Sequence, residues 1–260
     1  DISEGEIPNA GVFGNAVELG SRVSPAFGRT RPVRWVGIHY SQRARDVYAT
    51  EETAKWEQVL YPALGAYWTA LRDRRPVGIV TDSQLEQGLL DDVQVLFLPA
   101  PEHLTDRMKN AIAAFERNGG AVVRNRTDWQ WHTEDGQTNA MNSFRAAVDR
   151  AGRAPATAEG GPEKLHMMAY RGMNDDRLTV SLVNDFVWVP HGRITKAEAQ
   201  ERMAVPAPCT GVTVLLGDER TPKSVTDAVT GRALSARRTP RGFEVAVPDF
   251  PILAVLDVRY

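Results

Sequence analysis

Three carboxylates follow short apolar runs of the kind that form buried strands, and they are the side chains best placed for chemistry. They are Asp82, Glu102 and Asp128. Two carboxylates at a suitable separation can act as general acid and as base or nucleophile on a glycosidic bond. The competing interpretation is structural, with Asp82 and Asp128 capping helices or turns and Glu102 solvated. Spacing along the chain does not choose between them, so no catalytic residue is assigned.

Other polar and aromatic residues share these positions. Tyr40 and Ser41 follow the first apolar run, and His103 is next to Glu102. Trp129 and Trp131 could stack against a sugar ring, although tryptophans also fill domain and subunit interfaces, and the interface interpretation is favoured. We expect these residues, with the three carboxylates, to be the candidate binding residues.

Motifs of other chemistries are absent from the sequence. It has no Gly-x-Ser-x-Gly nucleophile elbow, no phosphate-binding glycine loop after a strand, and no His-Glu-x-x-His. The five histidines are scattered singly, which predicts no metal site, and no cofactor is expected. Cys209 lies in the loop-like VPAPCTG, far from the strand-to-helix turn that a class I amidotransferase nucleophile occupies.

The elements that position the candidates alternate between strand and helix. Four apolar runs predict strands, at 33–39, 77–81, 93–98 and 121–123. Helical spacing predicts helices at 50–71, 84–90 and 105–118, with Thr105 as N-cap and Gly119-Gly120 as the end of the third. This alternation is typical of a parallel sheet covered on both faces, which predicts a flavodoxin-like α/β domain over residues 31–155. In such a sheet a pocket forms beyond the carboxyl ends of the strands, where the candidates cluster.

The remaining chain predicts strands without intervening helices. The run GRAPATAEGGPEK has the composition of a linker or surface loop. Six strands are predicted after it, at 165–171, 178–184, 211–216, 223–227, 243–247 and 252–258. Short strands at close spacing are typical of a β-sandwich, which we place at residues 163–260. Residues 1–30 are expected to be a linker or helix from an upstream region.

Composition limits the partners and the compartment. The 31 basic and 33 acidic side chains give a net charge of -2, which offers no field for nucleic acid or an anionic membrane. No apolar run approaches the roughly 20 residues of a membrane span. We expect a soluble protein without nucleic-acid or membrane partners. One cysteine excludes only a disulfide-stapled scaffold, and of the compartments left open the cytoplasm is favoured.

Four stretches together resemble the C-terminal region of glycoside hydrolases related to family 42 β-galactosidases. They are RPVRWVGIHYSQRARDVY, VQVLFLPAPEHLTDRMKNAIAAFERNGGAVV, LTVSLVND and VTDAVTGRALSARRTPRGFEVAVPDFPILAVLDV. In that family an amidotransferase-like trimerisation domain and a small β-domain follow the catalytic barrel. The resemblance covers residues 30–260 and implies an oligomerising role. It carries over no catalytic residue, because the family's glutamates lie on a (β/α)8 barrel that this chain lacks.

Three hypotheses of different classes follow. The leading one is a non-catalytic accessory and oligomerisation region of a glycoside hydrolase in carbohydrate metabolism, with a second copy or an upstream or separate barrel as partner. The second is a stand-alone module that binds a carbohydrate or another small molecule at the strand rim. The third is a glycosidase that uses Asp82, Glu102 or Asp128.

Overall fold

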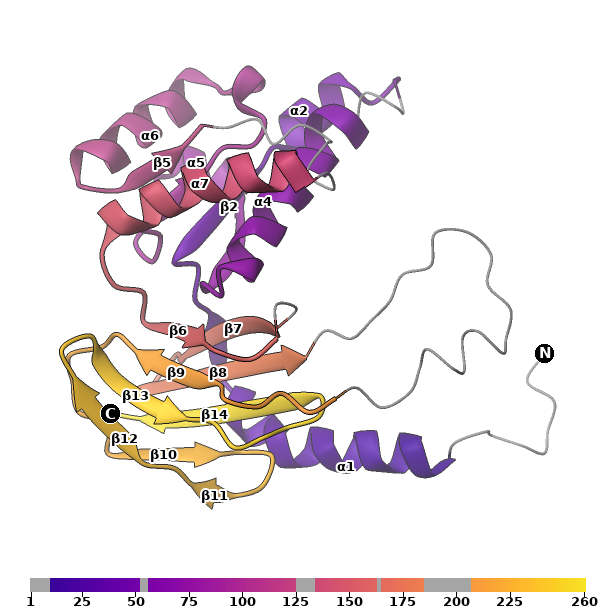
Figure 1. Ribbon diagram of the computed structural model, residues 1–260. Helices are drawn as coiled ribbons and strands as arrows, with labels where there is room; N and C mark the ends of the chain where they lie inside the picture. Colours follow the sequence, from indigo (N-terminus) through magenta and orange to yellow (C-terminus); the bar gives the residue numbers. More distant parts are fainter. Residues whose placement is uncertain (1–9, 52–55, 125–133, 163–164, 185–206) are drawn as a thin grey trace.

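The computed structural model describes residues 10–51, 56–124, 134–162, 165–184 and 207–260, and these form two units (Figure 1). One unit combines a parallel sheet with helices, and the other consists of antiparallel sheets and a helix. Among the described residues, no helix combines the length and the apolar composition needed to cross a membrane.

The α/β unit is built on a four-stranded parallel sheet. Its strands lie in the order β3 (Val77–Thr81), β2 (Val36–Tyr40), β4 (Val95–Phe97) and β5 (Ala121–Val123). All three pairings are parallel, as the alternation of strands and helices predicted. The first strand begins at Val36 rather than at the predicted residue 33, because Val33 bonds to the antiparallel unit instead.

Helices cover both faces of this sheet. On one face lie α4 (Tyr61–Arg72) and α7 (Glu134–Ala151), and on the other α5 (Asp82–Glu86) and α6 (Asp106–Arg117). The pleat of β4 matches this arrangement, since Phe97 packs in the core of the first face and Leu96 in the core of the second.

The ends of two helices follow from their sequences. Thr105 caps α6, its Oγ1 accepting the Met108 amide at 3.2 Å, and Gly119 follows the helix with φ +91°, as predicted. The helix predicted at 50–71 is split: a π-helical turn, η1 (Trp56–Leu60), precedes α4, and residues 52–55 lie outside the described chain. Pro62 near the start of α4 explains the break, because proline fits the first helical turn but not a helix interior.

Two antiparallel sheets form the second unit. The larger has the order β1 (Thr30–Pro32), β7 (Leu165–Gly172), β8 (Arg177–Asn184), β14 (Leu253–Arg259), β10 (Ser224–Asp227) and β11 (Arg232–Ala233). The smaller has the order β12 (Ala236–Thr239), β13 (Gly242–Ala246), β9 (Thr213–Leu216) and β6 (Ala156–Glu159). Leu182 of the larger sheet and Leu216 of the smaller belong to one buried cluster, so the sheets pack over a common core.

Two pieces of this unit come from segments for which no strand was predicted. Strand β1 precedes the α/β unit and pairs with β7, and β6 lies within the run expected to be a linker. The helix expected within residues 1–30 is α1 (Ala10–Phe27), which packs on the outer face of the larger sheet, with Val23 and Ala26 against Val255 of β14.

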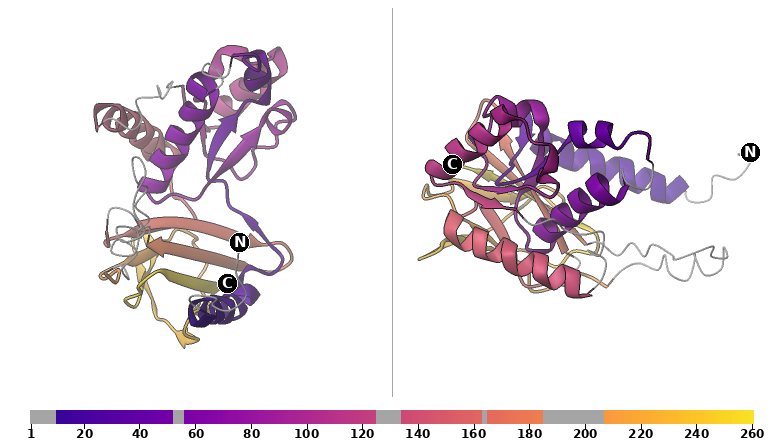
Figure 2. Two further views of the ribbon diagram at one scale, coloured as in Figure 1. Left: turned by 90° about the vertical axis from the view of Figure 1, so that its right-hand side faces the viewer. Right: turned by 90° about the horizontal axis from the view of Figure 1, so that it is seen from above.

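The α/β unit is therefore inserted into the antiparallel unit. The chain passes from β1 up to β2 and returns from α7 to β6, as Figure 2 shows. Helix α4 contacts β7 across the junction, where the Trp68 and His166 rings meet edge to face at 5.1 Å. One continuous apolar cluster runs from Ile38 in the parallel sheet to Val180 in the sandwich.

Candidate functional site at the carboxyl edge of the parallel sheet

The parallel register brings the ends of β2 and β3 together. His39 lies beside Val80, and Tyr40 beside Thr81, so the residues that follow each strand meet at one edge. Ser41 caps α2 (Gln42–Val47), and Asp82 is the first residue of α5. This is the edge at which the sequence predicts the candidate residues.

Asp82 is the centre of a hydrogen-bonded cluster. Its Oδ1 lies 2.9 Å from His39 Nε2, and its Oδ2 accepts the Arg43 amide at 2.8 Å and the Ser41 hydroxyl at 3.4 Å. Ser41 Oγ in turn accepts the Ala44 amide at 3.0 Å. The carboxylate thereby caps the first turn of α2 from the neighbouring strand.

The ionisation of Asp82 follows from these contacts. Burial raises the pKa of the carboxyl, but the hydrogen bonds from His39 and the Arg43 amide lower it by more, so the pKa lies below its ordinary value. An ionised carboxylate can only accept, which makes Nε2 the protonated nitrogen of His39. A general acid needs a raised pKa, so Asp82 is suited to holding charge and structure rather than to donating a proton.

His39 belongs to this site, although it is not among the residues predicted from the sequence. The ring is 2% exposed, and its Nδ1 has no hydrogen-bond partner within the described part of the chain. The predicted parallel pairing could have indicated His39. A polar residue near the carboxyl end of one strand lies close to the residues that follow the neighbouring parallel strand. Burial keeps His39 from direct contact with a bound molecule.

The other predicted residues surround this cluster. Tyr40 is half-buried and interacts with Arg45 of α2. Glu102 and His103 belong to η2 (Pro101–His103), a short 3-10 turn that packs against α2. His103 Nε2 lies 3.3 Å from the Tyr48 hydroxyl, and Glu102 is exposed. Asp128, Trp129 and Trp131 lie outside the described residues.

The arrangement supports a polar surface rather than an assembled acid pair. Ser41 and Asp82 are brought together, but Ser41 is only 3% exposed. Across the described ranges, no group of three or more metal-ligating side chains converges. At the rim Glu102 is exposed and Tyr40 and His103 are half-buried, and these side chains could offer hydrogen bonds to a hydroxylated molecule or a protein partner.

These features define a mixed α/β chain, with a parallel-sheet unit inserted into an antiparallel sandwich. No protein-family model and no curated protein sequence matches it. Among solved structures it is similar to α-L-fucosidase isoenzyme 2 from Paenibacillus thiaminolyticus, at 11% identity and a TM-score of 0.68, over 96% of this chain and 52% of that one. It also matches an exo-carrageenase described as GH42 from Bacteroides ovatus, at 12% identity and a TM-score of 0.42, over 95% of this chain and 32% of that one.

The chain therefore spans about half the length of the fucosidase structure. At 11% identity the likeness concerns the fold, and it covers both units together. The carrageenase match is too loose to add to the argument.

Proposed function

We propose that the chain is a non-catalytic accessory and assembly region of a glycoside hydrolase. The observation that carries the proposal is the asymmetry of the fucosidase match, which takes in 96% of this chain but leaves 48% of that enzyme unmatched. A (β/α)8 catalytic barrel requires about 250 residues, whereas the parallel sheet described for this chain has four strands. The catalytic part of such an enzyme thus belongs outside the matched region.

The chemistry of the rim supports a non-catalytic role. Both oxygens of Asp82 are engaged with His39, Ser41 and the Arg43 amide, and its pKa is lowered. A glycosidase needs one carboxyl group that stays protonated near neutral pH. Asp82 does not meet this requirement, which weakens the third hypothesis.

The strand order supports a more specific assignment of the α/β unit. In chain order β2 is the first strand and β3 the second, so the order β3-β2-β4-β5 has the 2-1-3-4 form of the flavodoxin-like sheet. We assign this unit as an amidotransferase-like assembly domain. Its partner is a second copy of the chain or a (β/α)8 barrel, upstream or separate, and the exposed rim supplies polar contacts.

Activity and mass measurements test the proposal together. We expect the purified chain to leave aryl α-L-fucoside and aryl β-D-galactoside intact, and to show a mass above the monomer in light scattering, alone or mixed with a (β/α)8 glycosidase domain encoded beside it. Glu102→Gln provides the matched control, because it removes one exposed rim carboxylate without changing its size. Turnover by the wild type that disappears in this variant would establish an enzyme instead. A monomer under every condition would contradict the assembly role.

A further inference from the structure

The outer strand of the parallel sheet, β3, has a free edge. It is the last strand of its sheet and pairs on one side only, with β2. The Val36 amide of β2 donates to the Pro76 carbonyl at 2.9 Å. In a parallel ladder every second residue from Pro76 onward therefore bonds to β2, which leaves the backbone groups of Val77 and Ile79 facing outward. Within the described ranges these outward groups have no hydrogen-bond partner, so β3 can accept a further strand.

The sequence of this edge lacks the usual protection against pairing. Exposed edge strands commonly carry charged residues or proline, which discourage the approach of another strand. Four other edge strands that the structure describes have such a residue, with Arg31 in β1, Glu159 in β6, Arg232 in β11 and Arg237 in β12, and β5 has only three residues. Strand β3 has the sequence Val-Gly-Ile-Val-Thr, without charge or proline. Its sequence therefore suits pairing with another chain.

Apolar side chains lie along the same edge. Ile79 is 42% exposed, and strand alternation places it on the face of Val77, which packs in the core together with Ala66 of α4. Leu64 of α4, the helix that contacts β3 on this face, is exposed as well. Covering apolar surface of this kind stabilises a complex by about 25 cal/mol per Å². A partner strand at this edge would gain both hydrogen bonds and apolar contact.

The two ends of β3 differ in charge, which favours a second copy of the same strand in the antiparallel direction. The segment 72–75 before the strand has three arginines and one aspartate, a net charge of +2. Helix α5 after the strand has two carboxylates and no basic residue, a net charge of -2. Antiparallel pairing about a two-fold axis places each basic end beside the acidic end of the other copy. With Ile79 opposite the partner's Ile79, outward-facing residues meet outward-facing residues.

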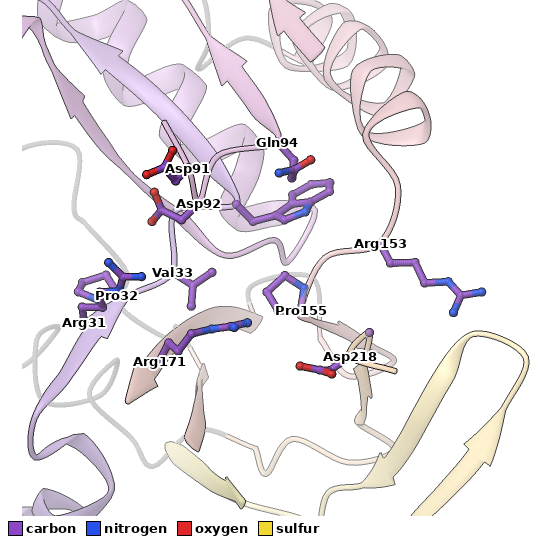
Figure 3. A pocket seen from close by; sticks show the side chains of 12 residues that line it. Arg31, Pro32, Val33, Asp91, Asp92, Gln94, Arg153, Pro155, Arg171 and Asp218 are labelled. Atoms are coloured by element: carbon purple, nitrogen blue, oxygen red, sulfur yellow. The ribbon is translucent and has the colours of Figure 1, made fainter. Parts of the chain in front are cut away.

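A pocket at the junction of the two units points to no partner of this kind. It has a volume of about 410 Å³ and lies between the starts of β2 and β4 and the strands β1 and β7 (Figure 3). Its charged lining consists of three arginines and three aspartates, Arg31, Arg153, Arg171, Asp91, Asp92 and Asp218. In Figure 3 Arg171 points toward Asp218, and its charge lowers the pKa of that carboxyl group. A balanced lining selects no class of ligand, whereas the edge of β3 selects a strand.

We propose that the chain forms a two-fold dimer in which β3 pairs antiparallel with β3 of a second copy. The two parallel sheets then continue into each other, and Ile79 lies at the centre of the contact. The inference rests on the assembly role proposed above, and it names the partner and the surface. A two-fold contact predicts dimers or assemblies built from dimers.

Analytical ultracentrifugation of the full chain tests the surface. We expect a dimer for the wild type and a dimer Kd raised about tenfold or more in Ile79→Lys, which removes apolar contact and places two ammonium groups opposite each other. Ile252→Lys is the matched control, because Ile252 is 44% exposed and lies in the other unit, and it should leave the Kd unchanged. Equal melting temperatures in the two variants would show that a loss of dimer does not reflect unfolding.

The outcomes separate this inference from the proposed function. A wild-type chain that is monomeric alone but associates with a (β/α)8 glycosidase domain would overturn the β3 dimer and leave the assembly role standing. The same holds if Ile79→Lys dimerises as tightly as the wild type. A chain that is monomeric both alone and with that domain would overturn both proposals.

Cross-linking tests the register. Directly opposite residues of a hydrogen-bonded antiparallel pair have Cα atoms about 5.5 Å apart, within the range of about 4.4–6.8 Å that a disulfide spans. Ile79→Cys should therefore form a covalent dimer with oxidised glutathione on a non-reducing gel, whereas Ile252→Cys should not. The native Cys209 is buried and serves as the background in both variants. A protein that is dimeric in solution but gives no Ile79→Cys cross-link would overturn the pairing.

Discussion

A single carboxylate links two strand ends at the rim of the parallel sheet. Asp82 accepts hydrogen bonds from the side chains of His39 and Ser41 and from the Arg43 amide, so it joins the segment after β2 to the segment after β3. The candidate list from the sequence included Asp82 and Ser41 because strand ends meet there. His39 was not among the predicted candidates, because a single histidine at the end of an apolar run does not indicate which residue it binds.

Asp82→Asn should destabilise the protein by about 1–3 kcal/mol at neutral pH, the usual cost of leaving buried donors poorly matched. Because the pKa of Asp82 is lowered in the folded state, its stabilisation is complete above the unfolded value of about 3.9 and is lost as the pH falls through the folded value. Urea unfolding at neutral pH and at several points below pH 4 would measure both effects.

The variant should therefore lose less stability than the wild type on acidification. Asp46→Asn is the matched control, since Asp46 is an exposed carboxylate in α2, the helix whose first turn Asp82 caps, and its effect should stay within about 0.5 kcal/mol. If the free energy of unfolding fell equally with pH in the wild type and in Asp82→Asn, the cluster would not stabilise a charged Asp82.

Helix α1 is attached to the sandwich through its last carbonyl groups. Arg177 of β8 donates to the carbonyl groups of Pro25 and Gly28, and Thr179 Oγ1 donates to that of Ala26 at 2.6 Å. The last carbonyl groups of a helix lack partners within the helix, so these bonds satisfy them. A basic side chain also interacts favourably with the negative end of the helix dipole.

Arg177→Met keeps the apolar stem but removes the guanidinium, so it should cost about 2 kcal/mol or more and loosen α1. Hydrogen exchange followed by mass spectrometry should show faster exchange in Ala10–Phe27, with little change in the parallel sheet. Thr179→Val should act in the same direction more weakly, and Arg232→Met, at an exposed site on β11, should have no effect. Unchanged exchange in α1 would mean that Val23 and Ala26 alone hold the helix.

The elements predicted from the sequence are those whose signals are local. The strands at Val77–Thr81 and Ala121–Val123 lie where the apolar runs placed them, and α6 ends as its glycines predicted. Strand β1 has the sequence Thr-Arg-Pro and exists because β7, far along the chain, offers it an edge. Pairing of this kind leaves no periodic pattern in the sequence.

At the scale of the whole molecule, insertion gives the two units two covalent connections and a common core. The apolar cluster includes Phe97 of the parallel sheet and Leu182 of the sandwich, and α4 packs against β7 between them. A large shared apolar interface opposes independent motion of domains. We therefore expect the two units to unfold as one.

Leu182→Ala tests this coupling from the far side of the junction. Leu182 is fully buried in the sandwich, so the substitution should cost about 2–5 kcal/mol. The three tryptophans in the described part of the chain, Trp35, Trp56 and Trp68, lie in or next to the α/β unit, so tryptophan fluorescence reports on that unit. If the units unfold together, the fluorescence midpoint in urea must fall with the loss of sandwich stability. Val183→Ala, on the same strand but 36% exposed, should move it little. An unchanged fluorescence midpoint in Leu182→Ala, beside a lowered circular-dichroism midpoint for the strands, would show that the shared core does not couple the units.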